Sequence, residues 1–343
     1  MKAALHREFG PVDVLHIEDV PEPGCAADEV VVRVRATGLN RLDILQRQGP
    51  PLLPLFELPH IPGMDVVGEV ADTGTDVNAL QRGDRVVINP ALPCGWCATC
   101  RSGDDAMCPN ARVVGGNRPG GYAEWVSVPA SHAYRIPDNV DDLAACALPT
   151  AYSTAWHALV ETGRLESGER ILIHGAGSSV SLAALEIARN HGALVVMTST
   201  SDSKLEVARR LGADVLVNNQ RDDVVAAVRA ATDGRGVDMV FDHVGPALFQ
   251  ASLFCLRPRG RMVFCGTTTG MQASFDLPYA YHFGIRLLGS DPYSQAEFER
   301  VLAYCFGAQV HPVIDREFGL DEARGAQQRM EAGDVIGKVV LRP

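Results

Sequence analysis

Short apolar strands alternate with amphipathic helices between residues 169 and 266, and this alternation constrains the fold more than any other feature of the chain. Apolar runs joined by helices predict βαβ units, and therefore a parallel sheet with helices on both faces. The helix at 179–190 shows the pattern, with apolar side chains at Val180, Ala183, Ala184 and Ile187. The expected strands are 169–175, 193–199, 214–218, 237–245 and 260–266, and the expected helices are 179–190, 202–211, 222–231 and 247–256.

The chain on either side of this segment has a different sequence pattern. Val-rich runs separated by Pro and Gly predict β-strands at 29–38, 64–74, 84–90 and 122–137. After residue 292 we expect helices at 295–307 and 321–332 and a last strand in GKVVL, which return to the first domain. The predicted organisation is a β-rich domain of residues 1–150 and 292–343, interrupted by a parallel-sheet domain of residues 151–291.

Length and charge narrow the functional class. A chain of 343 residues suits two domains. The formal net charge of −11 argues against a nucleic-acid partner, which would require clustered Lys and Arg. The first residues turn polar by His6, and no run approaches the ~20 apolar residues that span a bilayer. We expect a cytoplasmic protein that acts on a small molecule and does not bind membranes.

Four of the nine cysteines fall in one short segment near residues 90–110. Their spacing is C-x2-C-x2-C-x7-C, formed by Cys94, Cys97, Cys100 and Cys108. Four thiolates from one loop suit tetrahedral zinc and leave no position for substrate, so the sequence predicts one structural zinc. A disulfide pair and an iron–sulfur cluster are the alternatives, disfavoured by the compartment and by the spacing.

The first βα turn, IHGAGSSVSLAALEIA, predicts a phosphate-binding loop. Glycines after a strand and free N–H groups at a helix N-terminus suit a pyrophosphate. The motif is imperfect, because a valine stands at the third glycine position. The residues expected to contact the cofactor here are Gly175, Gly177, Ser178, Ser179 and Val180.

The end of the second strand bears on the choice between NAD and NADP. NAD sites place a carboxylate there for the ribose hydroxyls, whereas this chain offers Ser199, Ser201 and Lys204. Hydroxyls and a lysine can receive a 2′-phosphate, so NADP(H) is predicted, with NAD(H) as the less favoured alternative. A second interpretation is that this segment caps the next helix, since Ser203 and Glu206 have capping-box spacing.

Taken together, the chain resembles the medium-chain dehydrogenase/reductase superfamily, which includes zinc alcohol dehydrogenases and quinone oxidoreductases. The resemblance rests on the cysteine lobe, the βαβ core and the segments VRVRATGLNRLD, PGMDVVGEV, GGYAEW and GKVVL. It implies an α/β fold, a GroES-like catalytic domain with an inserted Rossmann domain. It also implies cofactor contacts from Arg41, Thr154, Gly266, Thr267 and Lys338.

The positions that hold the catalytic zinc in zinc alcohol dehydrogenases have changed. The resemblance aligns them with Asn40, Met64 and Thr150, and Leu42 stands where a proton-relay hydroxyl is usual. Amide, thioether and hydroxyl groups make a poor site for zinc, which prefers thiolate or imidazole. Asn40, Asp43 and Thr150 are therefore the candidate catalytic residues, without a catalytic metal.

The expected activity is reduction of an already electron-poor acceptor, because no Lewis acid activates an alcohol. We expect an NADPH-dependent reductase of quinones, enones or related activated carbonyls. Two alternatives stay open: a zinc-type alcohol dehydrogenase with an atypical active site, and a non-catalytic NADPH-binding protein. A homodimer or homotetramer is also expected, through a sheet-edge segment IRLLGSDPY at 285–293.

Overall fold

The computed structural model describes residues 1–290 and 292–343, and the chain divides into two compact units. One unit combines Met1–Thr150 with Ser294–Pro343, and the other is Ala151–Tyr293. Asp291, which was predicted to lie at the domain boundary and within the edge segment, lies outside the described residues. No helix in the described ranges has the length and apolar character needed to cross a bilayer.

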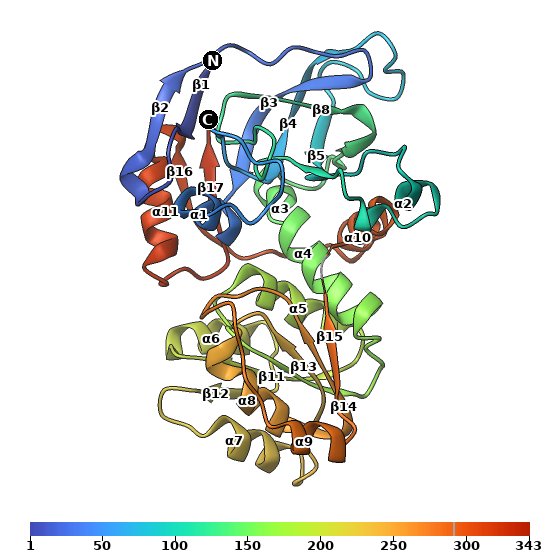
Figure 1. Cartoon of the computed structure of the whole chain (residues 1–343), viewed down its shortest axis with the longest axis vertical. Helices are drawn as coiled ribbons and strands as arrows, with labels where there is room; N and C mark the ends of the chain where they lie inside the picture. Colours follow the sequence, from blue (N-terminus) through green and yellow to red (C-terminus); the bar gives the residue numbers. More distant parts are fainter. Residues whose placement is uncertain (291) are drawn as a thin grey trace. The chain divides into compact units, whose positions relative to one another are not determined.

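The second unit is built on a parallel sheet of six strands in the order β12-β11-β10-β13-β14-β15. This is the doubly wound order, which reverses direction between β10 and β13. Its elements can be followed in Figure 1. The strands are β10 (Arg170–Ile173), β11 (Leu194–Ser199), β12 (Val215–Asn218), β13 (Val237–Asp242), β14 (Leu256–Phe264) and β15 (Arg286–Gly289).

Helices connect these strands, as the alternation predicts. The helix after β10 occupies the range that its apolar period indicates, because its inward face is wholly apolar or small. The helices are α5 (Ser179–Asn190), α6 (Asp202–Arg210), α7 (Val224–Ala231), α8 (Pro246–Cys255) and α9 (Leu277–His282). The α/β fold class with a parallel-sheet domain is confirmed.

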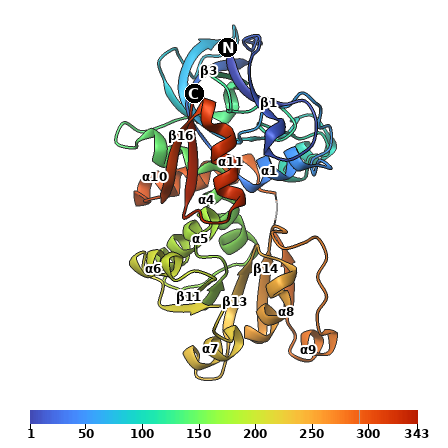
Figure 2. The same cartoon turned by 90° about the vertical axis from the view of Figure 1, so that its left-hand side faces the viewer.

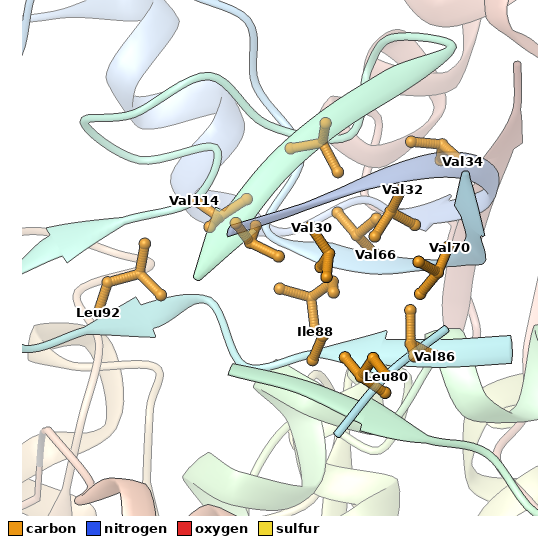
Figure 3. Close-up of a cluster of buried hydrophobic side chains, with 13 residues drawn as sticks. Val30, Val32, Val34, Val66, Val70, Leu80, Val86, Ile88, Leu92 and Val114 are labelled. Carbon is orange, nitrogen blue, oxygen red and sulfur yellow. The ribbon is translucent and has the colours of Figure 1, made fainter. Parts of the chain in front are cut away.

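The first unit contains a seven-stranded sheet path, β16-β17-β3-β4-β5-β9, with β8 pairing β3. Valines that alternate along the strands fill its core, and Figure 3 shows them converging from β3, β4 and β5. The larger strands are β3 (Glu29–Gly38), β4 (Asp65–Thr73), β5 (Arg85–Ile88), β8 (Trp125–Pro129), β9 (Ala133–Arg135), β16 (Ile314–Gly319) and β17 (Lys338–Arg342).

Several elements of this unit differ from the sequence prediction. The expected strand 122–137 is two strands, β8 and β9, because a 3-10 turn at Ala130–His132 interrupts it. The helix expected at 321–332 begins with a 3-10 turn and continues as α11 (Ala323–Glu331), which Figure 2 shows alongside β16 and β17. Unpredicted elements of this unit are β16, whose range is given above, and β1 (Lys2–His6), β2 (Leu15–Asp19), α1 (Arg41–Gln48), β6 (Ala91–Leu92), β7 (Arg112–Val113), α2 (Ala98–Arg101) and α3 (Asp142–Cys146).

Two further helices complete the description. The apolar stretch after residue 148 forms α4 (Pro149–Trp156), followed by a π-helical turn at His157–Thr162. Helix α10 (Gln295–Ala308) begins at the N-cap Ser294, whose side chain accepts a hydrogen bond from the backbone N–H of Glu297.

Candidate active site

The predicted phosphate loop lies between β10 and α5, at the point where the strand order reverses. Gly175 has a positive φ of 76°, which only glycine adopts without strain. Ser178 is the N-cap residue of α5, so the first N–H groups of the helix have no partner within the helix. The turn therefore places Gly175, Gly177, Ser178, Ser179 and Val180 around a helix N-terminus suited to an anion.

A serine and a histidine support this loop, and neither was predicted from the sequence to have a role. Ser181 Oγ donates to the carbonyl oxygen of His174 at 2.7 Å, and His243 Nε2 lies 2.6 Å from the same hydroxyl. Burial lowers the pKa of His243, which favours the neutral ring. The imperfect glycine pattern has a local explanation, since Ser181 holds the turn through its hydroxyl. A small hydroxyl side chain in the first turn of the predicted helix was the sequence signal that could have indicated this role.

The end of β11 carries the side chains predicted to discriminate between the nicotinamide cofactors. Ser199 is the last residue of β11 and is buried, and its hydroxyl accepts a hydrogen bond from the backbone N–H of Ser201 at 3.2 Å. The Ser203–Glu206 capping box is wrong, because α6 begins at Asp202 with Ser201 as its N-cap. Lys204 lies within the first turn of that helix.

The remaining cofactor candidates are spread over both units. Gly266 and Thr267 are exposed residues just after β14, at the same edge of the sheet as the phosphate loop. Thr154 is half-buried in α4. Arg41 is exposed at the first position of α1. Lys338 was expected to contact the pyrophosphate, but it is buried, and its side chain contacts Asp65 and Asn40.

A cluster of four polar side chains forms where β17, β3 and β4 adjoin. Strand register places Gly38 of β3 opposite both Asp65 and Val340, which brings the N-terminal end of β17 close to the start of β4. Lys338 forms an ion pair with Asp65, and the two side chains are 1% and 0% exposed. Lys338 Nζ also donates to Asn40 Oδ1 at 2.8 Å.

Asp65 is the centre of this cluster. Its Oδ2 accepts hydrogen bonds from Lys338 and from Asn40 Nδ2, the latter at 3.0 Å. Its Oδ1 accepts from the backbone N–H of Thr150 at 2.9 Å and from Thr150 Oγ1 at 2.6 Å. Charge-assisted bonds of this kind are about twice as strong as neutral ones, so the carboxylate fixes the orientation of Asn40 and Thr150.

Asp43 is not a member of this cluster, and it contacts the cluster through the backbone of Asn40. Its carboxylate accepts hydrogen bonds from the backbone N–H groups of Asn40 at 2.8 Å and Gly63 at 3.2 Å, and from Tyr122 Oη at 3.3 Å. Burial raises the pKa of Asp43 to about 7, and burial also raises that of Tyr122. Asp43 therefore orients the loop that carries Asn40.

The four predicted cysteines come together in a lobe around α2. Their sulfurs lie within 4.8 Å of one another, with Cys97–Cys100 at 3.4 Å and Cys97–Cys108 at 3.9 Å. Tetrahedral zinc with ~2.3 Å bonds requires sulfurs about 3.8 Å apart, which these distances approach. Backbone N–H groups point at the sulfurs, including that of Cys97 at 3.4 Å from Cys94 Sγ. In the described ranges, this is the one group of His, Cys, Asp and Glu side chains whose spacing suits a metal.

Comparisons with known proteins agree with this architecture. A family described as "Alcohol dehydrogenase GroES-like domain" matches residues 26–138, and one described as "Zinc-binding dehydrogenase" matches residues 179–306. An NAD-dependent alcohol dehydrogenase of Sulfolobus acidocaldarius is 30% identical over 100% of this chain and 99% of its own length. An acryloyl-coenzyme A reductase of Sulfurisphaera tokodaii is 26% identical over 97% of this chain and 98% of its own length.

A solved structure titled as an NAD-dependent alcohol dehydrogenase has a TM-score of 0.95 with this chain, at 35% identity and full coverage of both chains. The first family match lies in the first unit, and most of the second lies in the second unit. The chain belongs to the medium-chain dehydrogenase/reductase superfamily and is an NAD(P)-dependent oxidoreductase.

Proposed function

We propose that this chain is an NADPH-dependent reductase that transfers hydride to a quinone, an enone or a related activated carbonyl without a catalytic metal. The observation that carries the proposal is the composition of the Asn40–Asp65–Thr150–Lys338 cluster. It contains an amide, a carboxylate, a hydroxyl and an ammonium. When bound, the cofactor supplies the hydride, and these side chains orient the acceptor.

The donor set does not fit a catalytic zinc. Zinc in enzymes is held by thiolate, imidazole and carboxylate groups, and Asn40 and Thr150 supply neither thiolate nor imidazole. The one carboxylate, Asp65, is neutralised by Lys338, so the cluster has no net negative charge to attract a divalent cation. Both oxygens of Asp65 also already accept two hydrogen bonds each.

Oxidation of a simple alcohol is difficult without a metal, because no Lewis acid then stabilises the alkoxide that donates the hydride. Reduction of an electron-poor double bond has less need of one, since the acceptor itself stabilises the negative charge. The relative named acryloyl-coenzyme A reductase supports this class, because its named substrate is an activated double bond. Small-molecule acceptors of this class are therefore the proposed substrates.

The preference for NADPH rests on the end of β11. The strand ends in Ser199, and the nearest acid, Asp202, lies in α6, where it pairs with Arg221 and accepts from Asn218. A carboxylate engaged in this way is less available to the ribose hydroxyls of NAD. Hydroxyls near Lys204 suit a 2′-phosphate instead.

Two accessory features belong to the same proposal. The cysteine lobe would hold one structural zinc through Cys94, Cys97, Cys100 and Cys108, which contributes folding energy and no chemistry. Strand β15 ends the sheet order and offers an edge to a second copy, so a homodimer or homotetramer is proposed. Size-exclusion chromatography with light scattering tests the assembly, and a monomer would contradict it.

Steady-state kinetics test the proposed reaction. The purified chain is expected to oxidise NADPH with an ortho-quinone or an enone, with a higher kcat/KM than for NADH, and not to oxidise ethanol. Alcohol dehydrogenase is the competing function, favoured by the names of the full-length relatives. Ethanol oxidation without enone or quinone reduction would support it, and tight NADPH binding without turnover would indicate a non-catalytic protein.

A further inference from the structure

The doubly wound sheet of the second unit offers a dinucleotide a site with two halves. One half lies at the ends of β10, β11 and β12, and the other at the ends of β13, β14 and β15, on either side of the point where the strand order reverses. A dinucleotide spans both halves, whereas the phosphate loop after β10 belongs to one of them. Affinity for the whole cofactor therefore depends on how firmly the two halves are held relative to each other.

The side chain of His243 crosses this point. His243 follows β13 directly, and its Nε2 lies 2.6 Å from the hydroxyl of Ser181 in α5. The same nitrogen lies 3.2 Å from the carbonyl oxygen of His174, the residue after β10. A Cβ atom on Gly175 would lie 3.3 Å from His243 Cε1, so the imidazole packs against the phosphate loop.

The direction of these hydrogen bonds follows from the donors present. Ser181 has one hydroxyl proton, and the His174 carbonyl oxygen, 2.7 Å away, can only accept it. His243 Nε2 faces two oxygens, so every donor is satisfied when this nitrogen carries the ring proton. Burial lowers the pKa of His243, which favours the neutral ring that this arrangement requires. Ser181 is fully buried, so bulk water would not replace a lost partner.

The backbone of His243 contacts the other half of the site. Its carbonyl oxygen accepts a hydrogen bond from Thr268 Oγ1 at 3.1 Å, and a Cβ atom on Gly266 would lie 3.1 Å from the same oxygen. Both residues belong to the loop after β14, which also carries the cofactor candidate Thr267. His243 therefore contacts the phosphate loop through its ring and the loop after β14 through its backbone.

We propose that the hydrogen bond between His243 and Ser181 joins the two halves of the cofactor site and thereby positions the nicotinamide. Both residues act through the loops that they hold, so they are positioning residues. The bond is expected to matter for NADPH and NADH alike, because these differ only in the 2′-phosphate, for which the end of β11 is proposed. It is also expected to matter whichever acceptor is reduced.

A separate set of contacts holds the loop after β13 without the imidazole. Asp242 Oδ1 accepts hydrogen bonds from the backbone N–H groups of Val244 at 2.8 Å and Gly245 at 2.9 Å. Its Oδ2 accepts from Ser252 Oγ at 3.1 Å. Substitution of His243 is therefore expected to leave a folded chain in which this bond between the two loops is missing.

Binding of whole and half cofactors tests the proposal. NADPH and NADH are titrated through the fluorescence of the reduced nicotinamide. AMP and adenosine 2′,5′-bisphosphate, which lack the nicotinamide half, are titrated by displacement of the reduced cofactor. Ser181→Ala and His243→Leu are each expected to raise the Kd of the dinucleotides about tenfold, the effect of one buried hydrogen bond, and that of the fragments by less than about threefold.

Two comparisons separate positioning from a general loss of structure. In the double variant Ser181→Ala/His243→Leu, the Kd should rise about as much as in one single variant, because both substitutions remove the same bond. His243→Gln keeps a side-chain N–H donor and should bind the dinucleotides within about threefold of wild type. The matched control is His282→Leu, at an exposed histidine of the same unit, which should bind as wild type does.

Equal weakening of dinucleotides and fragments would overturn the proposal, because the two residues would then act within the phosphate loop alone. Additive losses, or unchanged dinucleotide affinity in both single variants, would also overturn it. If His243→Leu does not fold, the ratio of dinucleotide to fragment affinity in Ser181→Ala decides. A wild-type chain that binds neither cofactor would overturn this proposal, whereas a chain that binds cofactor but reduces neither quinones nor enones would overturn the proposed function alone.

Discussion

The buried Lys338–Asp65 pair gives a quantitative prediction about stability. Its side chains are 1% and 0% exposed, and Asp65 accepts from three residues in total. Removing one partner of a buried ion pair leaves an uncompensated charge and costs about 3–5 kcal/mol. We therefore expect Lys338→Met and Asp65→Asn each to lower the free energy of unfolding by this amount. The double variant should lose much less than the sum.

The matched control is an ion pair of the same residue types in the same unit. Lys2 and Asp19 lie 3.7 Å apart, with side chains 61% and 81% exposed. Exposed pairs contribute about 0–1 kcal/mol, so the corresponding substitutions Lys2→Met and Asp19→Asn should be nearly additive.

Urea denaturation of all variants yields the two coupling energies. Because the chain has two units, each resolved transition is fitted separately. The prediction is a coupling energy on the order of 2 kcal/mol or more for the buried pair, several times that of the exposed pair. Equal coupling energies for the two pairs would refute the reasoning from burial.

Three further predictions concern separate features of the chain. Burial raises the pKa of Asp43 to about 7, so the folded state keeps a proton that the unfolded state releases near pH 4. The free energy of unfolding should therefore fall by up to about 1.4 kcal/mol per pH unit as the pH rises from 4 to 7. Asp43→Asn should remove this slope from urea titrations, and an unchanged slope would contradict the shift. Cys108→Ser should reduce the zinc content from one to near zero per chain and lower Tm, whereas Cys25→Ser should change neither, and a Cys108 variant that keeps its zinc would contradict the lobe assignment. Ser199→Asp should lower kcat/KM for NADPH relative to NADH by about tenfold or more through charge repulsion. Ser199→Ala removes a hydroxyl without adding a charge, so it should lower the same ratio much less, and an unchanged ratio in the Asp variant would remove Ser199 from the cofactor site.

Sequence periodicity predicted most of the second unit because apolar strands there alternate regularly with helices such as α5, whose apolar residues recur on one face. Helix α5 occupies the predicted range, and the cysteine spacing predicted a lobe that does converge. Helix α1 was missed because RLDILQRQ is short and mostly polar. Its position depends on Asp43, whose contacts with Gly63 and Tyr122 come from distant parts of the chain.

The sequence identified most of the residues of the candidate site, but it did not indicate which of them contact one another. Asn40 and Thr150 were candidates, yet nothing in their spacing pairs them with the same carboxylate. The resemblance implied that Lys338 contacts the cofactor. Strands β17 and β4 both pair with β3 at Gly38, and this register brings Lys338 into buried contact with Asp65. The sequence alone does not show this pairing.

The central claim is that zinc in this chain is structural and that the reaction site works without a metal. Elemental analysis of the purified, fully loaded chain tests it most directly. We predict one zinc per chain, which Cys108→Ser removes. Two zincs per chain, with one remaining in that variant and lost together with alcohol oxidation, would contradict the claim and restore a zinc-dependent alcohol dehydrogenase.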